Sequence, residues 1–126
     1  MNYEILLKQL EDFEGLELKP YKCTSDKTTI GLGRNLDDYG ITKEEAYYLA
    51  QNNIDEIEDE LDNAISWWRD LNDARQRALI NLAYNVGTPT LLKFKKTLVA
   101  LFSFLNFTTI HHFLSWSFYF STFFHF

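Results

Sequence analysis

Three side chains near the amino terminus have the types and the spacing of a small catalytic group. Eight residues separate Glu14 from Cys23, and five separate Cys23 from Thr29. A carboxyl group can donate a proton to a leaving oxygen. A thiolate can supply negative charge if its pKa is depressed, and a hydroxyl can hold a water molecule. Together these groups could cleave a bond by protonating one side of it and handling charge or water on the other.

Each of the three residues also has an ordinary structural interpretation. Glu14 has acidic neighbours such as Asp12 and Glu17, which is the pattern of a solvated surface. A lone cysteine is commonly a small buried hydrophobe, and a β-branched threonine suits a strand. The catalytic hypothesis therefore depends on the elements that would bring the three side chains together.

The sequence predicts a helix followed by a small hairpin region. Apolar residues recur at helical spacing over residues 3–13, which indicates an amphipathic helix with Glu14 at its end. Residues 17–33 combine β-branched residues with turn formers, which is typical of a hairpin. A hairpin that folds back beside a helix end can bring Cys23 and Thr29 close to Glu14.

Helical patterns account for much of the chain that follows. The capping-box sequence Thr42-Lys43-Glu44-Glu45 begins a predicted helix that runs to about residue 64. A second helix is predicted near residues 73–86, and Gly87 would stop it. Thr88-Pro89 would begin a third, because proline suits the first helical position. The apolar face of that third helix would consist of Leu91, Phe94, Leu98 and Leu101.

Length and composition limit the possible functions. With 126 residues and a net charge of −6, the chain is predicted to be a single domain, 1–126, that does not bind nucleic acid. Its one cysteine cannot form an internal disulfide. The first dozen residues lack the basic start and apolar core of a signal peptide, so we expect synthesis and retention in the cytoplasm.

No metal or cofactor is predicted. The acidic residues between Asp55 and Asp62 are expected to form a solvated face of the long helix. The three histidines, His111, His112 and His125, have no cysteine or carboxylate near them in the sequence to complete a zinc site.

The composition changes near residue 97. Every Asp, Glu, Lys and Arg lies at or before Lys96, and nine of the eleven phenylalanines follow it. Residues 97–126 are therefore interpreted as an atypical uncharged aromatic tail. Its longest uninterrupted apolar run, Leu98–Phe102, is far shorter than the roughly 18 residues of a membrane span. A domain boundary, a membrane anchor and a frameshifted or aberrant end remain alternative explanations.

The sequence around the three candidate residues resembles that of phage-type lysozymes, the endolysins of glycoside hydrolase family 24. The family has aspartate or cysteine at the position that Cys23 occupies. The resemblance covers residues 1 to about 101. It rests on Glu14-Gly15-Leu16, on Thr29-Ile30-Gly31-Leu32-Gly33, on Ile41-Thr42-Lys43-Glu44-Glu45-Ala46 and on the stretch from Arg75 to Gly87.

This resemblance implies a fold and an activity. The fold would be α+β and lysozyme-like, with a small β-containing amino-terminal lobe, a long connecting helix, a helical carboxy-terminal lobe and a cleft between the lobes. The activity would be hydrolysis of the β-1,4 bond between N-acetylmuramic acid and N-acetylglucosamine in bacterial peptidoglycan. Glu14 would be the acid, Cys23 would replace the aspartate, and Thr29 would hold water or substrate.

The same resemblance implies a role in host cell lysis by a phage or prophage. The enzyme would remain in the host cytoplasm until a holin-like pore released it to the wall, and we expect a monomer. Two features depart from the family pattern. Arg34 stands where many members have histidine, and the aromatic tail replaces the closing helices. An inactive truncated prophage remnant and a tail-anchored membrane protein are therefore the alternatives.

Overall fold

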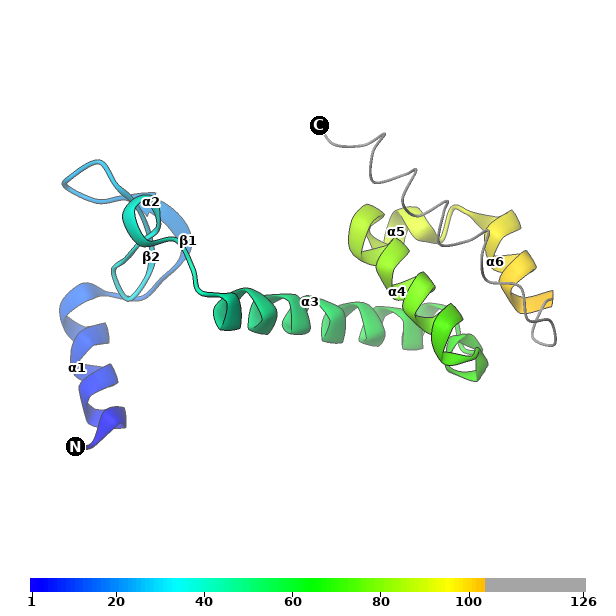
Figure 1. Ribbon diagram of the computed structural model, residues 1–126, viewed down its shortest axis with the longest axis horizontal. Helices are drawn as coiled ribbons and strands as arrows, with labels where there is room; N and C mark the ends of the chain where they lie inside the picture. The colour runs from blue at the N-terminus through cyan, green and yellow to red at the C-terminus, as the bar shows by residue number, and fades with distance from the viewer. Residues whose placement is uncertain (104–126) are drawn as a thin grey trace. The chain divides into compact units, whose positions relative to one another are not determined.

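The computed structural model describes residues 1–103, which contain two compact units (Figure 1). The first unit is Met1–Tyr47 and the second begins at Tyr48. The first unit contains α1 (Tyr3–Glu14), β1 (Glu17–Lys22), β2 (Thr28–Gly31), β3 (Arg34–Asn35) and α2 (Leu36–Tyr39). Helix α3 (Lys43–Ala64) begins in the first unit and continues into the second. The second unit also contains η1 (Trp68–Asp70), α4 (Asp73–Val86), α5 (Thr88–Leu91) and α6 (Lys95–Ser103).

Helix α1 places Glu14 at its last position, as the sequence predicts. Asn2 caps the start of the helix, since its side-chain oxygen accepts a hydrogen bond from the Ile5 amide at 3.1 Å. Gly15 ends the helix with a φ of +74° and donates its amide to the carbonyl of Glu11 at 2.8 Å. The chain therefore turns sharply immediately after the candidate acid.

The three strands form one antiparallel sheet in the order β1-β2-β3. Thr29 lies at the centre of it, paired with Tyr21 on one side and Asn35 on the other. The turn between β1 and β2 is closed by the Cys23 carbonyl, which accepts the Asp26 amide at 2.9 Å. The predicted hairpin is confirmed, whereas β3 and α2 were not predicted.

Helix α3 begins with the predicted capping box. The Glu45 amide donates to Thr42 Oγ1 at 3.1 Å, and the Thr42 amide donates to Glu45 Oε2 at 2.7 Å. The helix ends at Ala64, which agrees with the predicted limit.

The core of the second unit lies between α3, α4, α5 and α6. Its largest fully buried side chains are Trp68, Leu61, Leu79 and Leu91. Helix α4 spans the predicted residues 73–86, with Asn72 as its cap and Gly87 as its stop. These helices bury their apolar stripes against one another, as amphipathic helices of a small domain do.

The third predicted helix begins at Thr88 but is interrupted. Helix α5 ends at Leu91, and α6 starts only at Lys95. Between them the Lys93 amide bonds to Thr90 and the Phe94 amide to Leu91, which are the short-range bonds of a tightened helical turn. A stripe of apolar residues looks the same with or without such a break, so the sequence pattern does not reveal it.

The first part of the predicted aromatic tail belongs to α6. Leu101 is buried in the core, and the Phe102 ring centroid lies 5.2 Å from that of Trp67. The rest of the tail, residues 104–126 with its three histidines, lies outside the described residues. Within residues 1–103 no helix has the length and hydropathy that a membrane crossing requires.

An Asp62 carboxylate holds the buried Trp68 and the Arg69 guanidinium together. The indole Nε1 of Trp68 donates to Asp62 at 2.7 Å, and Arg69 donates to both carboxylate oxygens at 2.6 and 2.8 Å. These bonds, that of Arg69 first, hold the pKa of the Asp62 carboxyl below its ordinary value of 3.8. The charged form of Asp62 therefore stabilises the second unit.

We predict that Asp62→Ala lowers the urea midpoint of unfolding more than Asp62→Asn, because alanine leaves the buried indole N–H unpaired. The advantage of the wild type over Asp62→Asn should be complete above the ordinary carboxyl pKa. It should shrink as the pH falls through the lowered pKa of Asp62. Urea titrations followed by tryptophan fluorescence between about pH 3 and pH 7 measure both effects. Identical midpoints for the three proteins at pH 7 would contradict this interpretation.

Candidate active site

The carboxyl group of Glu14 lies against Gly33, in the turn between β2 and β3. A Cβ added to Gly33 would lie 3.2 Å from Glu14 Oε2 and 3.6 Å from its Cδ. Gly33 also has a φ of +82°, a conformation that residues with a side chain rarely adopt. Two independent constraints therefore favour glycine here. The exposed Glu14 side chain rests on a backbone turn that leaves room for it.

Cys23 and Thr29 come together at the β1–β2 hairpin. Cys23 follows β1 as a free, half-buried thiol, and Thr29 in β2 is only 4% exposed. Hydrogen bonds from the backbone of Lys27 and of Ser25, and then from the Thr29 side chain, lower the pKa of the Cys23 thiol from its ordinary value of 9.0. The hairpin thus favours the thiolate, which is the reactive and charged form of cysteine.

The Thr29 hydroxyl has one proton and two acceptors for it. Its Oγ1 donates to the Lys27 carbonyl at 3.0 Å, and it also lies within hydrogen-bond reach of the Cys23 sulfur. When the thiol ionises, the hydroxyl proton can turn to the thiolate at the cost of the carbonyl bond. Thr29 is buried, so these two groups, and not bulk water, are the contacts of its hydroxyl. We therefore interpret Thr29 as a hydrogen-bond donor to the thiolate of Cys23.

Helix α2 anchors the hairpin that carries these residues. Asp37 Oδ2 accepts the Thr28 amide at 2.7 Å, and Asp38 Oδ1 accepts the Lys27 ammonium at 2.9 Å. The Thr28 bond is the main reason why the pKa of the Asp37 carboxyl falls below its ordinary value. The positions of Lys27 and Thr28, and with them the surroundings of Cys23, therefore depend on two aspartates of α2.

Arg34 connects the sheet to the start of α3. Its Nε donates to the Gly40 carbonyl at 3.0 Å, and its guanidinium lies 3.5 Å from Glu45 Oε2. Glu45 is the acidic member of the capping box, so one carboxylate serves both the helix end and Arg34. The arginine that departs from the family pattern thus holds β3, which directly follows Gly33, against the connection to α3.

The structure brings Cys23 and Thr29 into contact and places Glu14 against a turn of the same sheet. Sequence reasoning missed Gly33 as the residue that touches the acid, and it missed the two aspartates of α2. The role of Gly33 had a signal in the sequence Gly31-Leu32-Gly33, since closely spaced glycines often mark a place where another group approaches the backbone closely. Residues 1–103 contain no group of three His, Cys, Asp or Glu side chains that could hold a metal ion.

One known protein family matches most of the chain. The model of the phage lysozyme family matches residues 11–118, a range that includes Glu14, Cys23, Thr29 and Gly33. The chain belongs to the phage lysozyme family. No curated protein matches it.

Family membership confirms the predicted α+β lysozyme-like fold, with its small antiparallel sheet near the amino terminus and its long helix α3. It also makes this phage lysozyme a peptidoglycan-hydrolysing endolysin in general terms. The match extends to residue 118, beyond the limit near residue 101 that the sequence resemblance indicated.

Gly33→Ala should reduce peptidoglycan hydrolysis by about 10–100-fold, because the new Cβ displaces the Glu14 carboxyl. The matched control is Gly31→Ala in the same hairpin. Gly31 has a similar φ of +69°, but its added Cβ meets nothing within 4 Å. Both variants should lose about 1–2 kcal/mol of stability through backbone strain, and only Gly33→Ala should lose most of its activity. Equal activity losses in the two folded variants would show that the contact with Glu14 is unimportant.

Alkylation of Cys23 by iodoacetamide should show a thiol pKa below 9.0. Thr29→Val should raise that pKa only part of the way back, because the backbone bonds of Lys27 and Ser25 remain. Thr28→Val serves as the control, since the Thr28 hydroxyl accepts from Lys22. The measurement is the alkylation rate as a function of pH. An unchanged profile in Thr29→Val would remove Thr29 from the account of the thiol.

Proposed function

We propose that this endolysin is a muramidase that hydrolyses the β-1,4 bond between N-acetylmuramic acid and N-acetylglucosamine. Its site would consist of Glu14 and Cys23 as catalytic residues and Thr29 as the residue that positions the thiol. The observation that carries the proposal is that two chemical groups lie at the same small sheet. A carboxyl group is seated on the Gly33 turn, and a thiol with a lowered pKa lies on the adjoining hairpin. Glycosidic bond cleavage requires an acid for the leaving oxygen and a second group for the positive centre that develops.

Glu14 is the proposed acid. Its carboxyl would protonate the glycosidic oxygen as the bond to the sugar breaks. The side chain is exposed in the free protein, so a bound glycan strand would have to exclude water from it. Contact with the Gly33 turn limits the positions that the carboxyl can take, which reduces the cost of orienting it for proton transfer.

Cys23 is the proposed second group, in place of the aspartate found in many relatives. As a thiolate it would supply negative charge near the oxocarbenium-like centre, or it would orient the attacking water. Thr29 contributes through Cys23, because its buried hydroxyl is directed to the thiol and to the Lys27 carbonyl. Thr29 is therefore a positioning residue for the thiol in this proposal.

The biological role that we propose is lysis of the host cell by a phage or prophage. The enzyme would accumulate as a monomer in the host cytoplasm and reach the wall after a holin-like protein opens the membrane. The family match supports hydrolysis of peptidoglycan, which is the step that lysis requires. Co-expression with and without a holin, followed by measurement of culture lysis, tests it. Lysis that does not depend on the holin would contradict the route.

The activity is tested with purified Gram-negative peptidoglycan. The full chain should release soluble fragments whose reducing ends, after borohydride treatment, are reduced N-acetylmuramic acid. Glu14→Gln should lower the rate by at least about 100-fold, because the glutamine amide cannot donate the proton. Glu17→Gln, which removes a nearby exposed carboxylate of β1, should retain the activity.

Two results would contradict the proposal. Fragments with reduced N-acetylglucosamine ends would show that the other glycosidic bond is cleaved. No release of fragments by the folded parent would favour the alternative of an inactive remnant.

A further inference from the structure

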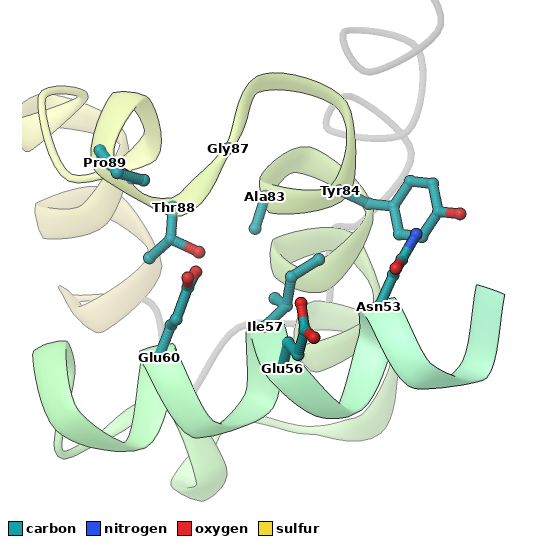
Figure 2. Close-up of a pocket in the computed structure, with 9 residues that line it drawn as sticks. All are labelled: Asn53, Glu56, Ile57, Glu60, Ala83, Tyr84, Gly87, Thr88 and Pro89. Carbon is teal, nitrogen blue, oxygen red and sulfur yellow. The ribbon is translucent and has the colours of Figure 1, made fainter. Parts of the chain in front are cut away.

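The second unit contains a groove that is separate from Glu14, Cys23 and Thr29. It has a volume of about 270 Å³ and lies between α3 and the end of α4, where the chain turns into α5 (Figure 2). Its lining residues are Asn53, Glu56, Ile57, Glu60, Ala83, Tyr84, Gly87, Thr88 and Pro89. All of them lie in the second unit, so the groove does not depend on the placement of the first.

Thr88 places at this groove a polar atom that has no hydrogen-bond partner among residues 1–103. The residue is 5% exposed, and its buried Oγ1 makes no hydrogen bond within the described part of the chain. Figure 2 shows the Thr88 hydroxyl and the Glu60 carboxyl pointing toward one another across the groove. A buried hydroxyl without a partner is costly, so such an atom in a folded protein calls for an explanation.

The groove also carries negative charge that the described residues do not neutralise. Glu56 and Glu60 are four residues apart on α3, a spacing at which like charges face each other and repel. Elsewhere on this helix Glu58 and Asp62 pair with Arg69, but neither groove carboxylate pairs with a Lys or Arg of residues 1–103. The negative end of the α4 helix dipole lies at the same place.

The rest of the lining suits a hydrocarbon chain. Ile57, Ala83 and Pro89 present apolar side chains, and Tyr84 adds an aromatic ring (Figure 2). Alkyl groups gain from such surfaces, and a cation can interact favourably with a ring face. The groove therefore combines acceptor oxygens and negative charge with an apolar wall.

We propose that this groove binds an alkylammonium group. An ammonium has three N–H donors and no acceptor. The carboxylates of Glu56 and Glu60 would accept two of them. The third acceptor would be the buried Oγ1 of Thr88, which has no partner among residues 1–103, once the bound cation displaces the Glu60 side chain that faces it. The cation would relieve the repulsion between the two glutamates, and its alkyl chain would lie along Ile57 and the Tyr84 ring. The ligand is either a free polyamine or the amino side chain of a diamino acid in a wall peptide.

Binding is tested with 1,5-diaminopentane and the full-length protein, by calorimetry and by ¹⁵N NMR shifts. We expect millimolar affinity, which is what a shallow groove with exposed carboxylates can provide. Shifts should concentrate at Ile57, Ala83 and Thr88. Glu60→Gln should weaken binding by about fivefold or more, whereas Asp59→Asn, which removes a charge from the next position of α3, should weaken it less than about twofold. Equal weakening by both variants, or equal binding of the neutral 1-pentanol, would overturn the proposal.

Thr88→Val tests the unpaired hydroxyl itself. Without ligand the variant should unfold at the same temperature as the parent or higher, because no hydrogen bond is lost. The diamine should then raise its unfolding temperature less than it raises that of the parent. A lower unfolding temperature in the absence of ligand would show that Oγ1 already has a partner, and it would overturn this part of the proposal. The Glu60→Gln comparison does not depend on that result.

The source of the ammonium is decided by a second ligand pair. A muropeptide with a free diamino-acid side chain is compared with the same muropeptide acetylated at that amine. Binding of the free form alone assigns the wall peptide, whereas binding of diaminopentane without either muropeptide assigns a free polyamine. Equal binding of the acetylated form would contradict recognition of the charge. The Glu14→Gln variant should lose muramidase activity and still give all these binding results. The proposal of an ammonium site and the proposal of muramidase activity can therefore fail independently.

Discussion

A Cβ added to Gly33 would lie 3.2 Å from the Glu14 carboxyl, and this close approach is the constraint on which the proposed position of the acid depends. The carboxyl comes from the end of α1 and the glycine from a turn of the sheet, so both elements must have fixed ends. Gly15 ends the helix sharply, and Arg34 ties the strand after the turn to Gly40 and Glu45. These contacts limit the positions of the exposed Glu14 carboxyl, and in the proposed reaction a bound glycan strand would cover it.

The hairpin carries Cys23, the second residue of the proposed site, and acts on it through hydrogen bonds. Backbone amides and one buried hydroxyl favour the charged form of Cys23, and Asp37 and Asp38 of α2 hold the chain that supplies them. A thiolate stabilised in this way carries the same charge as the carboxylate found at this position in many relatives. The hydrogen bonds of the hairpin therefore favour the negative charge that the chemistry proposed for Cys23 requires.

Much of this architecture was predictable because its signals are local. The cap at Asn72, the capping box of Thr42 and Glu45, and the stops at Gly15 and Gly87 each act over a few residues, so the helices follow from sequence. The contact of Glu14 with Gly33 and the bonds of α2 to the hairpin join residues that no periodicity relates. Such contacts depend on how separate elements pack in three dimensions, which local sequence patterns do not specify.

The most direct test of the central claim is the pH dependence of peptidoglycan hydrolysis for Cys23→Ser and Cys23→Asp beside the parent. If the thiolate acts in the reaction, the parent profile contains a limb that follows ionisation of Cys23 below its ordinary pKa of 9.0. Cys23→Ser should lose that limb and most of the activity. Cys23→Asp should stay active with the limb moved to lower pH. A Cys23→Ser enzyme with the rate and profile of the parent would show that the thiol is structural and that the catalytic group has been misassigned.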